Sequence, residues 1–240
     1  STGVFGALSR GSSPRPRAMT SRLFPIVLAA GSGIRMQSDL AKVLHQVCGR
    51  SLISHVLHSV LDLDAEPITV VVSADAQTVR DEATVVAQVT FVEQSKQRGT
   101  GDAVMCALAE LPEDSDSDDV LVLPGDSPLL SAETLSELVQ AHRESDAAVT
   151  MLSAVVDDPT GYGRVARGDE GEVVRIVEHA DADEDERLID EIATSVYCFR
   201  RSLLGPALRK ISPDNVQSEL YLTDVISLFA DMGHPVEAVV

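Results

Sequence analysis

The chain has 240 residues, of which 44% are hydrophobic, enough to bury the core of one large domain or two small ones. Its 38 acidic and 19 basic residues give a formal net charge of −19, which excludes the broad cationic surface that a nucleic acid or an anionic membrane requires. No apolar run approaches the roughly 20 residues that span a bilayer, so we expect a soluble protein without a nucleic-acid or membrane partner. An anionic ligand must then be met by local cations, by backbone N–H groups or by a metal ion. Its three cysteines lie far apart and outside any metal-ligand spacing, so we interpret them as reduced buried thiols, which suits a cytoplasmic protein.

Residues 1–18 differ in composition from the rest of the chain. They contain three arginines and no acidic residue, and they lack the apolar core of a secretory signal. We expect this segment to be disordered. Met19 lies directly before the first strand-like run, so we interpret it as the native start and residues 1–18 as an appended segment, with a transit peptide as the alternative.

From Phe24 onward, short β-branched runs alternate with stretches of helical periodicity. This pattern predicts a Rossmann-like α/β fold, a mostly parallel sheet with helices on both faces. The expected strands are 24–29, 68–73, 88–93 and 119–126, the last ending in a turn. The expected helices are 51–61, 76–86, 100–111 and one that begins after the N-cap Ser131.

Beyond about residue 147 the pattern changes to closely spaced strands. We expect a smaller antiparallel region built from strands near 147–156, 163–168, 172–179 and 192–199. Two helices, at about 201–210 and 218–231, close the chain. The acidic runs at 113–119 and 181–186 indicate solvated loops rather than metal sites.

The loop after the first expected strand reads AAGSGIRM. It is no dinucleotide fingerprint, because Met36 replaces the third glycine, and no P-loop, because no Gly-Lys-Ser/Thr ending follows. Gly31 and Gly33 allow the backbone to turn tightly and to present N–H groups to a phosphate. Arg35 can bind phosphate oxygens bidentately, while Lys42 adds a point charge. The loop follows the carboxyl end of a strand, where open α/β sheets bind their ligands.

Several sequence stretches then point to one family. LAAGSGIRM, with Lys42, resembles the signature of sugar-phosphate nucleotidyltransferases. In chain order, six further stretches resemble the uridyltransferase domain of the bifunctional N-acetylglucosamine-1-phosphate uridyltransferase/glucosamine-1-phosphate acetyltransferases: KVLHQVCGRSLISHVL (42–57), QSKQRGTGDAV (94–104), GDSPLL (125–130), DDPTGYGRV (157–165), RIVEHADA (175–182) and NVQSELYLTD (215–224). The resemblance covers residues 23–240.

The resemblance implies an enzyme with a nucleotidyltransferase domain at 19–240, in which 24–146 bind the nucleotide and 147–240 bind the sugar. The implied reaction joins UTP and N-acetylglucosamine 1-phosphate into UDP-N-acetylglucosamine and pyrophosphate, a step that supplies bacterial peptidoglycan, the cell-wall polymer. The sugar phosphate attacks the α-phosphorus in line, so catalysis rests on alignment and charge neutralisation, with Mg²⁺ as cofactor.

The family's site residues are carried over by their position in these motifs. The implied catalytic cations are Arg35 and Lys42, and the implied Mg²⁺ ligands are Asp126 and Asn215, whose oxygens suit this ion. The residues implied to bind nucleotide or sugar are Ala30, Gly31, Gly33, Gln94, Gly99, Thr100, Gly125, Gly163, Glu178 and Thr194.

These roles compete with ordinary structural interpretations. The amide of Gln94, with Gly99 and Thr100, corresponds to the family's base-reading group, whereas on sequence alone Gln94 reads as a surface residue. The Glu178 carboxylate corresponds to the family's acceptor for a sugar hydroxyl. The alternative interpretation is that Glu178 is a solvated residue at the end of a strand. Asp126 and Asn215 would otherwise be turn formers.

Five positions depart from the family pattern: Ile34 replaces Thr, Ala41 replaces Pro, Asp102 replaces His, Ala193 replaces a sugar-contacting Asn, and Ser195 replaces Gly. Asp102 suits the first turn of a helix but adds negative charge close to the nucleotide site. Losing one hydrogen bond to the sugar costs about 0.5–1.5 kcal/mol. Two alternatives therefore stay open: a related nucleotidyltransferase with another base or sugar-phosphate preference, and a catalytically silent nucleotide-sugar-binding domain.

The family continues into a β-helix of hexapeptide repeats that carries acetyl transfer and assembles homotrimers. Nothing in residues 19–240 resembles these repeats, so we interpret that domain as absent from this chain. We expect no acetyltransferase activity from these residues, and we expect a trimer only through the missing domain.

Overall fold

The elements alternate between strand and helix through the first half of the chain. The structure, a computed structural model, describes residues 21–31, 33, 36–113 and 117–240. Its strands are β1 (Leu23–Leu28), β2 (Gln46–Val47), β3 (Arg50–Ser51), β4 (Ile68–Ser73), β5 (Val89–Gln94), β6 (Asp119–Pro124), β7 (Val149–Val155), β8 (Arg164–Arg167), β9 (Val173–Val177), β10 (Glu191–Arg200) and β11 (Val236–Val239). Its helices are η2 (Lys42–Leu44), α1 (Leu52–Leu61), α2 (Gln77–Val86), α3 (Thr100–Glu110), α4 (Ala132–Glu144), η3 (Glu186–Leu188), α5 (Arg201–Leu208) and α6 (Asp224–Asp231).

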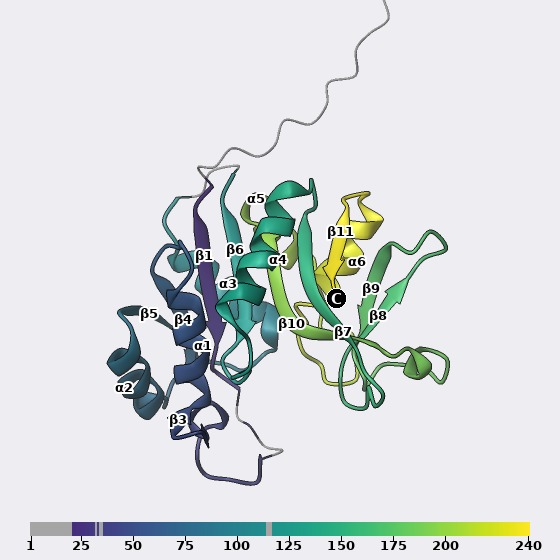
Figure 1. The fold of residues 1–240 in the computed structure, drawn as a ribbon. Coiled ribbons are helices and arrows are strands. Elements are labelled where there is room, and N and C mark those ends of the chain that lie inside the picture. The colour runs from purple at the N-terminus through teal and green to yellow at the C-terminus, as the bar shows by residue number, and fades with distance from the viewer. Residues whose placement is uncertain (1–20, 32, 34–35, 114–116) are drawn as a thin grey trace, which may run out of the picture.

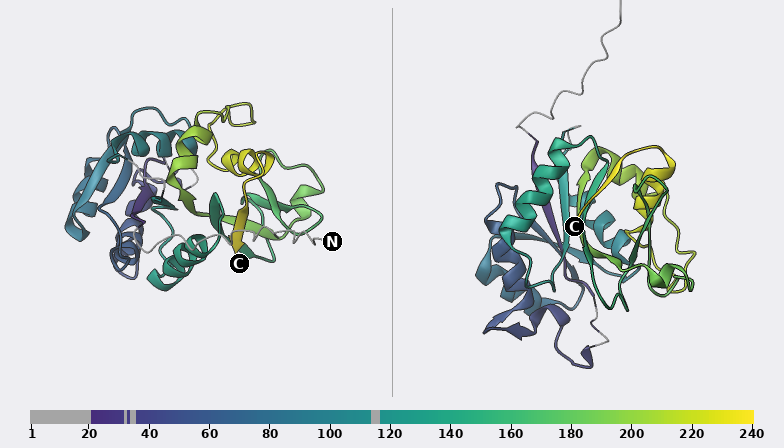
Figure 2. Two further views of the ribbon diagram at one scale, coloured as in Figure 1. Left: turned by 90° about the horizontal axis from the view of Figure 1, so that it is seen from above. Right: turned by 45° about the vertical axis from the view of Figure 1, so that its right-hand side comes forward.

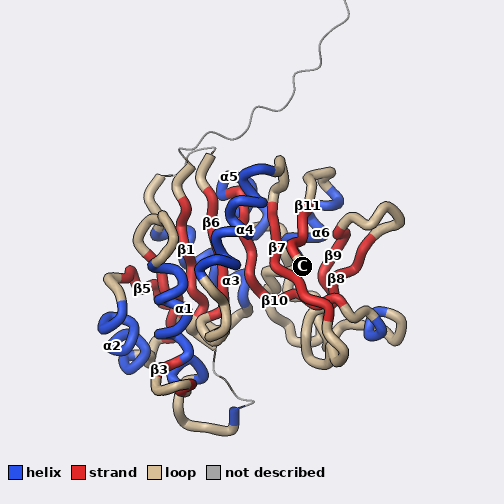
Figure 3. The backbone as a smooth tube through the Cα atoms, viewed as in Figure 1, coloured by secondary structure: helices blue, strands red, loops and turns tan. Residues whose placement is uncertain are grey.

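One large sheet runs through the molecule in the order β11-β7-β10-β6-β1-β4-β5, with β8 and β9 attached beside β10 (Figures 1 and 3). Strand β1 pairs in parallel with β4 and β6, and β4 pairs in parallel with β5. Strand β10 is antiparallel to both β6 and β7, and β8 is antiparallel to β9. The predicted parallel core with a smaller antiparallel region is confirmed.

Two apolar layers cover the two faces of the sheet, because successive residues of a strand point to opposite sides. Along β1, Phe24 and Ile26 are buried with residues of α3, α5 and α6, whereas Val27 is buried with residues of α1, α2 and α4. Seen from above, helices lie on both sides of the strands (Figure 2). Each fully buried aliphatic side chain of this kind contributes about 1.5–3 kcal/mol.

Two helices begin at serine caps, and one of them is the predicted cap. The Ser131 hydroxyl accepts a hydrogen bond from the Thr134 N–H at 3.0 Å, and the Ser51 hydroxyl accepts one from the Ser54 N–H at 3.2 Å. Each cap satisfies one N–H group that the first helical turn leaves without a partner.

The parallel strands place their carboxyl ends at one edge of the sheet. The loops after β1, β4, β5 and β6 therefore meet at that edge, although they are far apart in the sequence. Among the described residues no helix combines the length and the apolar character needed to cross a membrane.

The structure corrects the end of the chain. The second closing helix was expected from residue 218, but α6 begins at Asp224. The preceding residues bond instead to the start of α3: the Leu220 N–H donates to the Arg98 carbonyl at 2.7 Å, and the Gly101 N–H donates to the Leu220 carbonyl at 2.8 Å. The sequence analysis also missed β11, which pairs in parallel with β7.

Candidate functional site

A lysine and an aspartate meet at the carboxyl edge of the parallel strands. Lys42 opens η2 after the loop that follows β1, and its ammonium group forms an ion pair with the Asp126 carboxylate, which follows β6. The Lys42 side chain is 45% exposed and that of Asp126 is 19% exposed, so both reach solvent at this edge. An exposed pair of this kind adds little stability.

Two glycines allow the backbone to approach this pair closely. Gly33 has a φ of 61°, and a Cβ there would lie 2.8 Å from the Lys42 Cβ. The Gly125 N–H donates to the Leu28 carbonyl at 2.9 Å, and a Cβ at 125 would lie 3.1 Å from that same oxygen. A side chain at either position would push the loop away from the strand ends.

The rest of the predicted phosphate loop is described in part. Gly31 is exposed, and among the described residues, its chain neighbours aside, no atom lies within 4 Å of the position that its Cβ would take. Ala30 is buried, and its carbonyl accepts a hydrogen bond from the Gln97 side-chain amide at 2.6 Å. The predicted cation Arg35, like the departure Ile34, lies outside the described residues.

The predicted base-reading residues gather where β5 ends and α3 begins. The Gln94 side chain is 5% exposed, and its amide nitrogen donates to the Gly99 carbonyl at 3.1 Å and to the Asp102 carboxylate at 2.8 Å. Gly99 has a φ of 106°, and a Cβ there would lie 2.5 Å from the Leu220 carbonyl oxygen. The Thr100 hydroxyl accepts from the Leu222 N–H at 3.0 Å.

Asp102 is an ion-paired residue in the first turn of α3. Its buried carboxylate accepts from the Arg98 guanidinium at 2.6 Å as well as from Gln94. Arg98 was not among the predicted site residues; it lies in the loop before α3, and its four-residue spacing to Asp102 is the signal that could have indicated this ion pair.

The predicted sugar-binding residues lie in the antiparallel region. A Cβ at Gly163 would lie 3.5 Å from one Glu178 carboxylate oxygen, and the other Glu178 oxygen accepts from the Thr223 hydroxyl at 3.0 Å. Ala193 is buried beside them, and its N–H donates to the Gly163 carbonyl at 2.9 Å. The structure thus brings Gly163, Glu178 and Ala193 together.

Thr194 and Ser195 form an irregularity in β10, where the pairing with β7 shifts register between Ala193 and Val196. The Thr194 hydroxyl donates to the Leu152 carbonyl at 2.7 Å, so it is used by the sheet itself. Ser195 has a φ of 64°, in the left-handed region that favours glycine, which explains why a glycine is usual at this position.

Asn215 lies beside an acidic hollow of about 300 Å³ that Glu178 also lines. Its amide oxygen accepts from the Glu219 N–H at 3.1 Å, and its amide nitrogen donates to the Glu219 carbonyl at 2.6 Å. In the same hollow, burial and the carboxylates of Glu178 and Asp181 raise the pKa of Asp224 to about 6. Within the described residues no hydrogen bond or ion pair joins Asn215 to Asp126.

The segment from Asn215 to Thr223 connects the two groups of residues. Leu220 and Leu222 bond to the segment at the start of α3, beside the predicted base-reading residues, whereas Thr223 bonds to Glu178, one of the predicted sugar-binding residues. A displacement of Leu220 and Leu222 would therefore also move Thr223, which bonds to Glu178.

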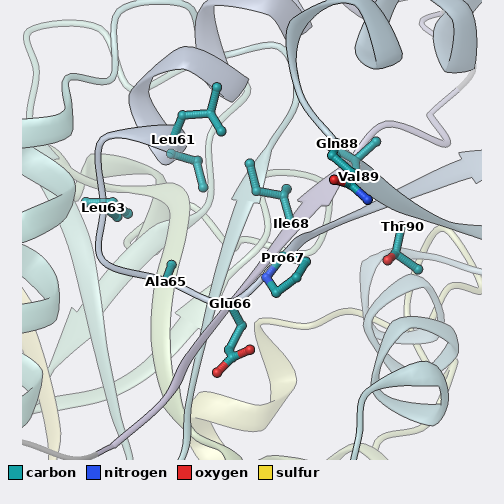
Figure 4. Close-up of a pocket in the computed structure, with 10 residues that line it drawn as sticks. Leu61, Leu63, Ala65, Glu66, Pro67, Ile68, Gln88, Val89 and Thr90 are labelled. Carbon is teal, nitrogen blue, oxygen red and sulfur yellow. The ribbon is translucent and has the colours of Figure 1, made fainter.

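A second hollow, of about 430 Å³, lies at the opposite edge of the sheet, where β4 and β5 begin (Figure 4). Its walls are mainly apolar, with one carboxylate, Glu66, and among the described residues that line it none is cationic. It therefore offers no group to a polyphosphate, and the candidate site stays at the carboxyl edge.

Comparison with known proteins gives the family resemblance independent support. The family model of the MobA-like NTP transferase domain matches residues 25–220. The chain is 46% identical over 218 residues to the bifunctional protein GlmU of Mycolicibacterium vanbaalenii, covering 89% of this chain and 44% of that protein. It is 46% identical over 216 residues to the same-named protein of Brevibacillus brevis, covering 90% of this chain and 46% of that protein. The chain thus spans less than half the length of these relatives, and the matches confirm the family resemblance that the motifs indicate.

Two solved structures share the fold. One is a UDP-glucose pyrophosphorylase complexed with UDP-glucose, with a TM-score of 0.71, 15% identity and 90% of each chain covered. The other is the 4-diphosphocytidyl-2C-methyl-D-erythritol synthase of Anaerococcus prevotii, with a TM-score of 0.63, 20% identity, and 91% of this chain and 86% of that chain covered. At these identities the likeness shows the nucleotidyltransferase fold alone.

Proposed function

We propose that this chain, which belongs to the MobA-like NTP transferase family, transfers a uridylyl group from UTP to N-acetylglucosamine 1-phosphate and releases pyrophosphate. The observation that carries the proposal is the Lys42–Asp126 ion pair at the carboxyl edge of the sheet. It lies between the loops after β1 and β6, where Gly33 and Gly125 allow close backbone approach. The 46% identity to bifunctional GlmU proteins supports the choice of nucleotide and acceptor.

The chemistry suits a site that contributes charge and alignment. A phosphate oxygen of the sugar phosphate attacks the α-phosphorus of UTP, and the bond to pyrophosphate breaks, so the protein needs to supply no covalent nucleophile. Lys42 would offset the charge of the triphosphate, and the N–H groups near Gly31 and Gly33 would bind its oxygens. Holding both reactants in line removes most of the entropic cost of their encounter.

We propose Mg²⁺ as the metal ion, with the ligands that the family resemblance implies. The ion prefers few protein oxygens and keeps water and phosphate ligands, which suits one carboxylate and one amide. Asp126, partly exposed, would hold the ion; Asn215 is the proposed second ligand, because its amide oxygen keeps a lone pair beyond the bond from Glu219. When bound, Mg²⁺ would neutralise negative charge on the phosphate oxygens.

The sugar would lie against the antiparallel region. The Glu178 carboxylate accepts from the Thr223 hydroxyl at 3.0 Å, and both of its oxygens lie within 3.6 Å of the position that a Cβ at Gly163 would take. We propose this carboxylate as the acceptor for a sugar hydroxyl. Acetyl transfer and trimer formation fall outside the proposal, which concerns nucleotidyl transfer by these residues.

The test is pyrophosphate release from UTP and N-acetylglucosamine 1-phosphate with and without Mg²⁺, with the nucleotide sugar identified by mass spectrometry. We expect release that requires both substrates and the metal ion. No release at saturating substrates would refute the proposal.

A second candidate, transfer to a different sugar phosphate, is favoured by Ala193. This residue lies beside Gly163 and Glu178, and its methyl group cannot replace the hydrogen bonds of an asparagine amide. A panel of hexose and N-acetylhexosamine 1-phosphates distinguishes the two: the first proposal expects the highest kcat/KM with N-acetylglucosamine 1-phosphate, and the second with another member.

A further inference from the structure

The fold alone does not determine which pyrimidine base the site selects. Of the two structural neighbours, one is named for a uridine nucleotide and the other for a cytidine nucleotide. Uracil and cytosine have nearly the same shape. They differ in polarity, because N3 of uracil carries a hydrogen and donates, whereas N3 of cytosine accepts. A protein that distinguishes them must therefore fix the polarity of the group that faces N3.

Gln94 alone cannot supply that polarity. A glutamine amide has a donor end and an acceptor end of nearly equal size, and a half-turn of its terminal bond exchanges them. A free amide at the end of β5 could pair with either base.

The neighbours of Gln94 remove this freedom. Its amide nitrogen lies 2.8 Å from an Asp102 carboxylate oxygen and 3.1 Å from the Gly99 carbonyl oxygen. Both partners are acceptors only, so a half-turn would place the amide oxygen against two oxygens and lose both hydrogen bonds. The assignment of the two ends thus follows from the chemistry of the partners.

The second oxygen of Asp102 accepts from the Arg98 guanidinium at 2.6 Å, so both carboxylate oxygens of Asp102 have donors. Asp102 is 3% exposed and Gln94 is 5% exposed, so little water competes for the carboxylate–amide bond. Both hydrogens of the Gln94 amide nitrogen are used, and within the described part of the chain no hydrogen bond engages its amide oxygen, which remains for a ligand.

We propose that Asp102 is a positioning residue that locks the Gln94 amide with its oxygen toward the base, so that the site selects a base with an N3–H group, uracil, over cytosine. The proposal rests on the proposed function, because it takes the nucleotide site to lie at Gln94. It gives a role to a residue that departs from the family pattern, where a histidine is usual.

The test is equilibrium binding of UTP and of CTP, each with Mg²⁺ and without the sugar phosphate, measured by isothermal titration calorimetry. We expect the wild-type protein to bind UTP about 100-fold more tightly than CTP, since the wrong base would set two acceptors against each other. Asp102→Leu removes the lock and is expected to lower this ratio at least about tenfold, mainly through tighter CTP binding. A general loss of packing would instead weaken the binding of UTP and CTP equally and leave the ratio of their affinities unchanged.

The chain offers a matched control. Gln77 donates to the Asp81 carboxylate at 2.8 Å on the exposed surface of α2, the same amide–carboxylate pair away from the site. Asp81→Leu is expected to leave both affinities unchanged. If circular dichroism shows that Asp102→Leu does not fold, Asp102→Ala removes the carboxylate without adding bulk.

The outcomes separate the role of Asp102 from the proposed transfer reaction. Equal binding of UTP and CTP by the wild-type protein, or an unchanged ratio in the folded Asp102 variant, overturns the role of Asp102. Retained discrimination without pyrophosphate release refutes the transfer reaction and leaves the role of Asp102 intact. A protein that binds neither nucleotide refutes both.

Discussion

The two ends of strand β6 hold aspartates in opposite situations. At its start, the side chains of Asp118 and Asp119 are 1% and 0% exposed; Arg22 donates to Asp118 at 2.6 Å and Arg143 donates to Asp119 at 3.1 Å. Just past its end, Asp126 is partly exposed and pairs with the flexible side chain of Lys42. The carboxylates at the amino edge are enclosed by cations and serve the fold, whereas the one at the carboxyl edge remains accessible to a ligand.

The amino edge is also tied together by an aromatic ring. The guanidinium carbons of Arg22 and Arg201 lie 5.0 and 4.9 Å from the centroid of the Phe24 ring, within the range of cation–π attraction. Both arginines also bind Asp118. This end of the sheet is therefore a rigid support for the open end.

The largest expected effect is on activity at the open end. Lys42→Ala removes the cation that would offset the triphosphate charge, and we expect pyrophosphate release to fall by about 10²–10³-fold. Because the side chain is exposed, the free energy of unfolding should change by less than about 0.5 kcal/mol. Lys210→Ala, which changes an exposed lysine away from the site, is the control and should keep full activity. An equal loss in both variants would contradict the assignment.

The largest expected effect on stability is at the closed end. Asp119→Ala removes a buried carboxylate that accepts from Arg143 and Ser21, and should lower the free energy of unfolding by about 1–3 kcal/mol, measured by urea denaturation. Asp126→Ala should change it by less than about 0.5 kcal/mol. Similar losses in the two variants would remove the distinction between the ends.

A smaller effect concerns the acidic hollow beside Asn215. The folded-state pKa of Asp224, about 6, lies above its ordinary value of 3.8, so the folded state binds this proton more tightly than the unfolded state does. The stabilisation is complete below about pH 4 and is lost as the pH rises through 6; it amounts to about 1 kcal/mol after allowance for solvent at this half-buried group.

Asp224→Asn should therefore match the wild-type stability near pH 4 and exceed it by about 1 kcal/mol at pH 8. The measurement is urea denaturation at both pH values. Asp231→Asn, at the exposed other end of α6, keeps Asp224 and should therefore show the same pH profile of stability as the wild-type protein. A variant at 224 with the same pH profile as the wild-type protein would show that the carboxylate is not strained by its neighbours.

The smallest effect is expected in β10. Ser195 adopts a φ of 64°, so Ser195→Gly should raise the free energy of unfolding by about 0.5–1 kcal/mol. Thr194→Gly, at the neighbouring position, should lower it, because the bond from the Thr194 hydroxyl to the Leu152 carbonyl is lost. A loss of stability in both variants would show that the left-handed backbone at 195 carries no strain.

The elements with strong local patterns were predictable from sequence. Strand 68–73 was predicted with the bounds of β4, and helix 76–86 differs from α2 by one residue at its start. In both segments the apolar spacing that defines the element is also what buries it. The short strand β11 was not predicted. Its four residues carry no strong local pattern, and they form a strand because they pair with β7.

The site was predictable as a set of residues but not as an arrangement. The glycine loop and the sequence around Asp126 could be recognised locally, whereas their meeting depends on β1 and β6 being neighbours in the sheet. The lock on Gln94 depends on how three side chains from β5, the following loop and α3 pack together, and no motif records that geometry.

The measurement that tests the central claim most directly is a crystal structure of the protein with UTP and Mg²⁺. The account predicts triphosphate density between Lys42 and Asp126, with the base beside Gln94. Density for the nucleotide in the hollow at the start of β4, or anywhere else away from the carboxyl edge, would contradict it.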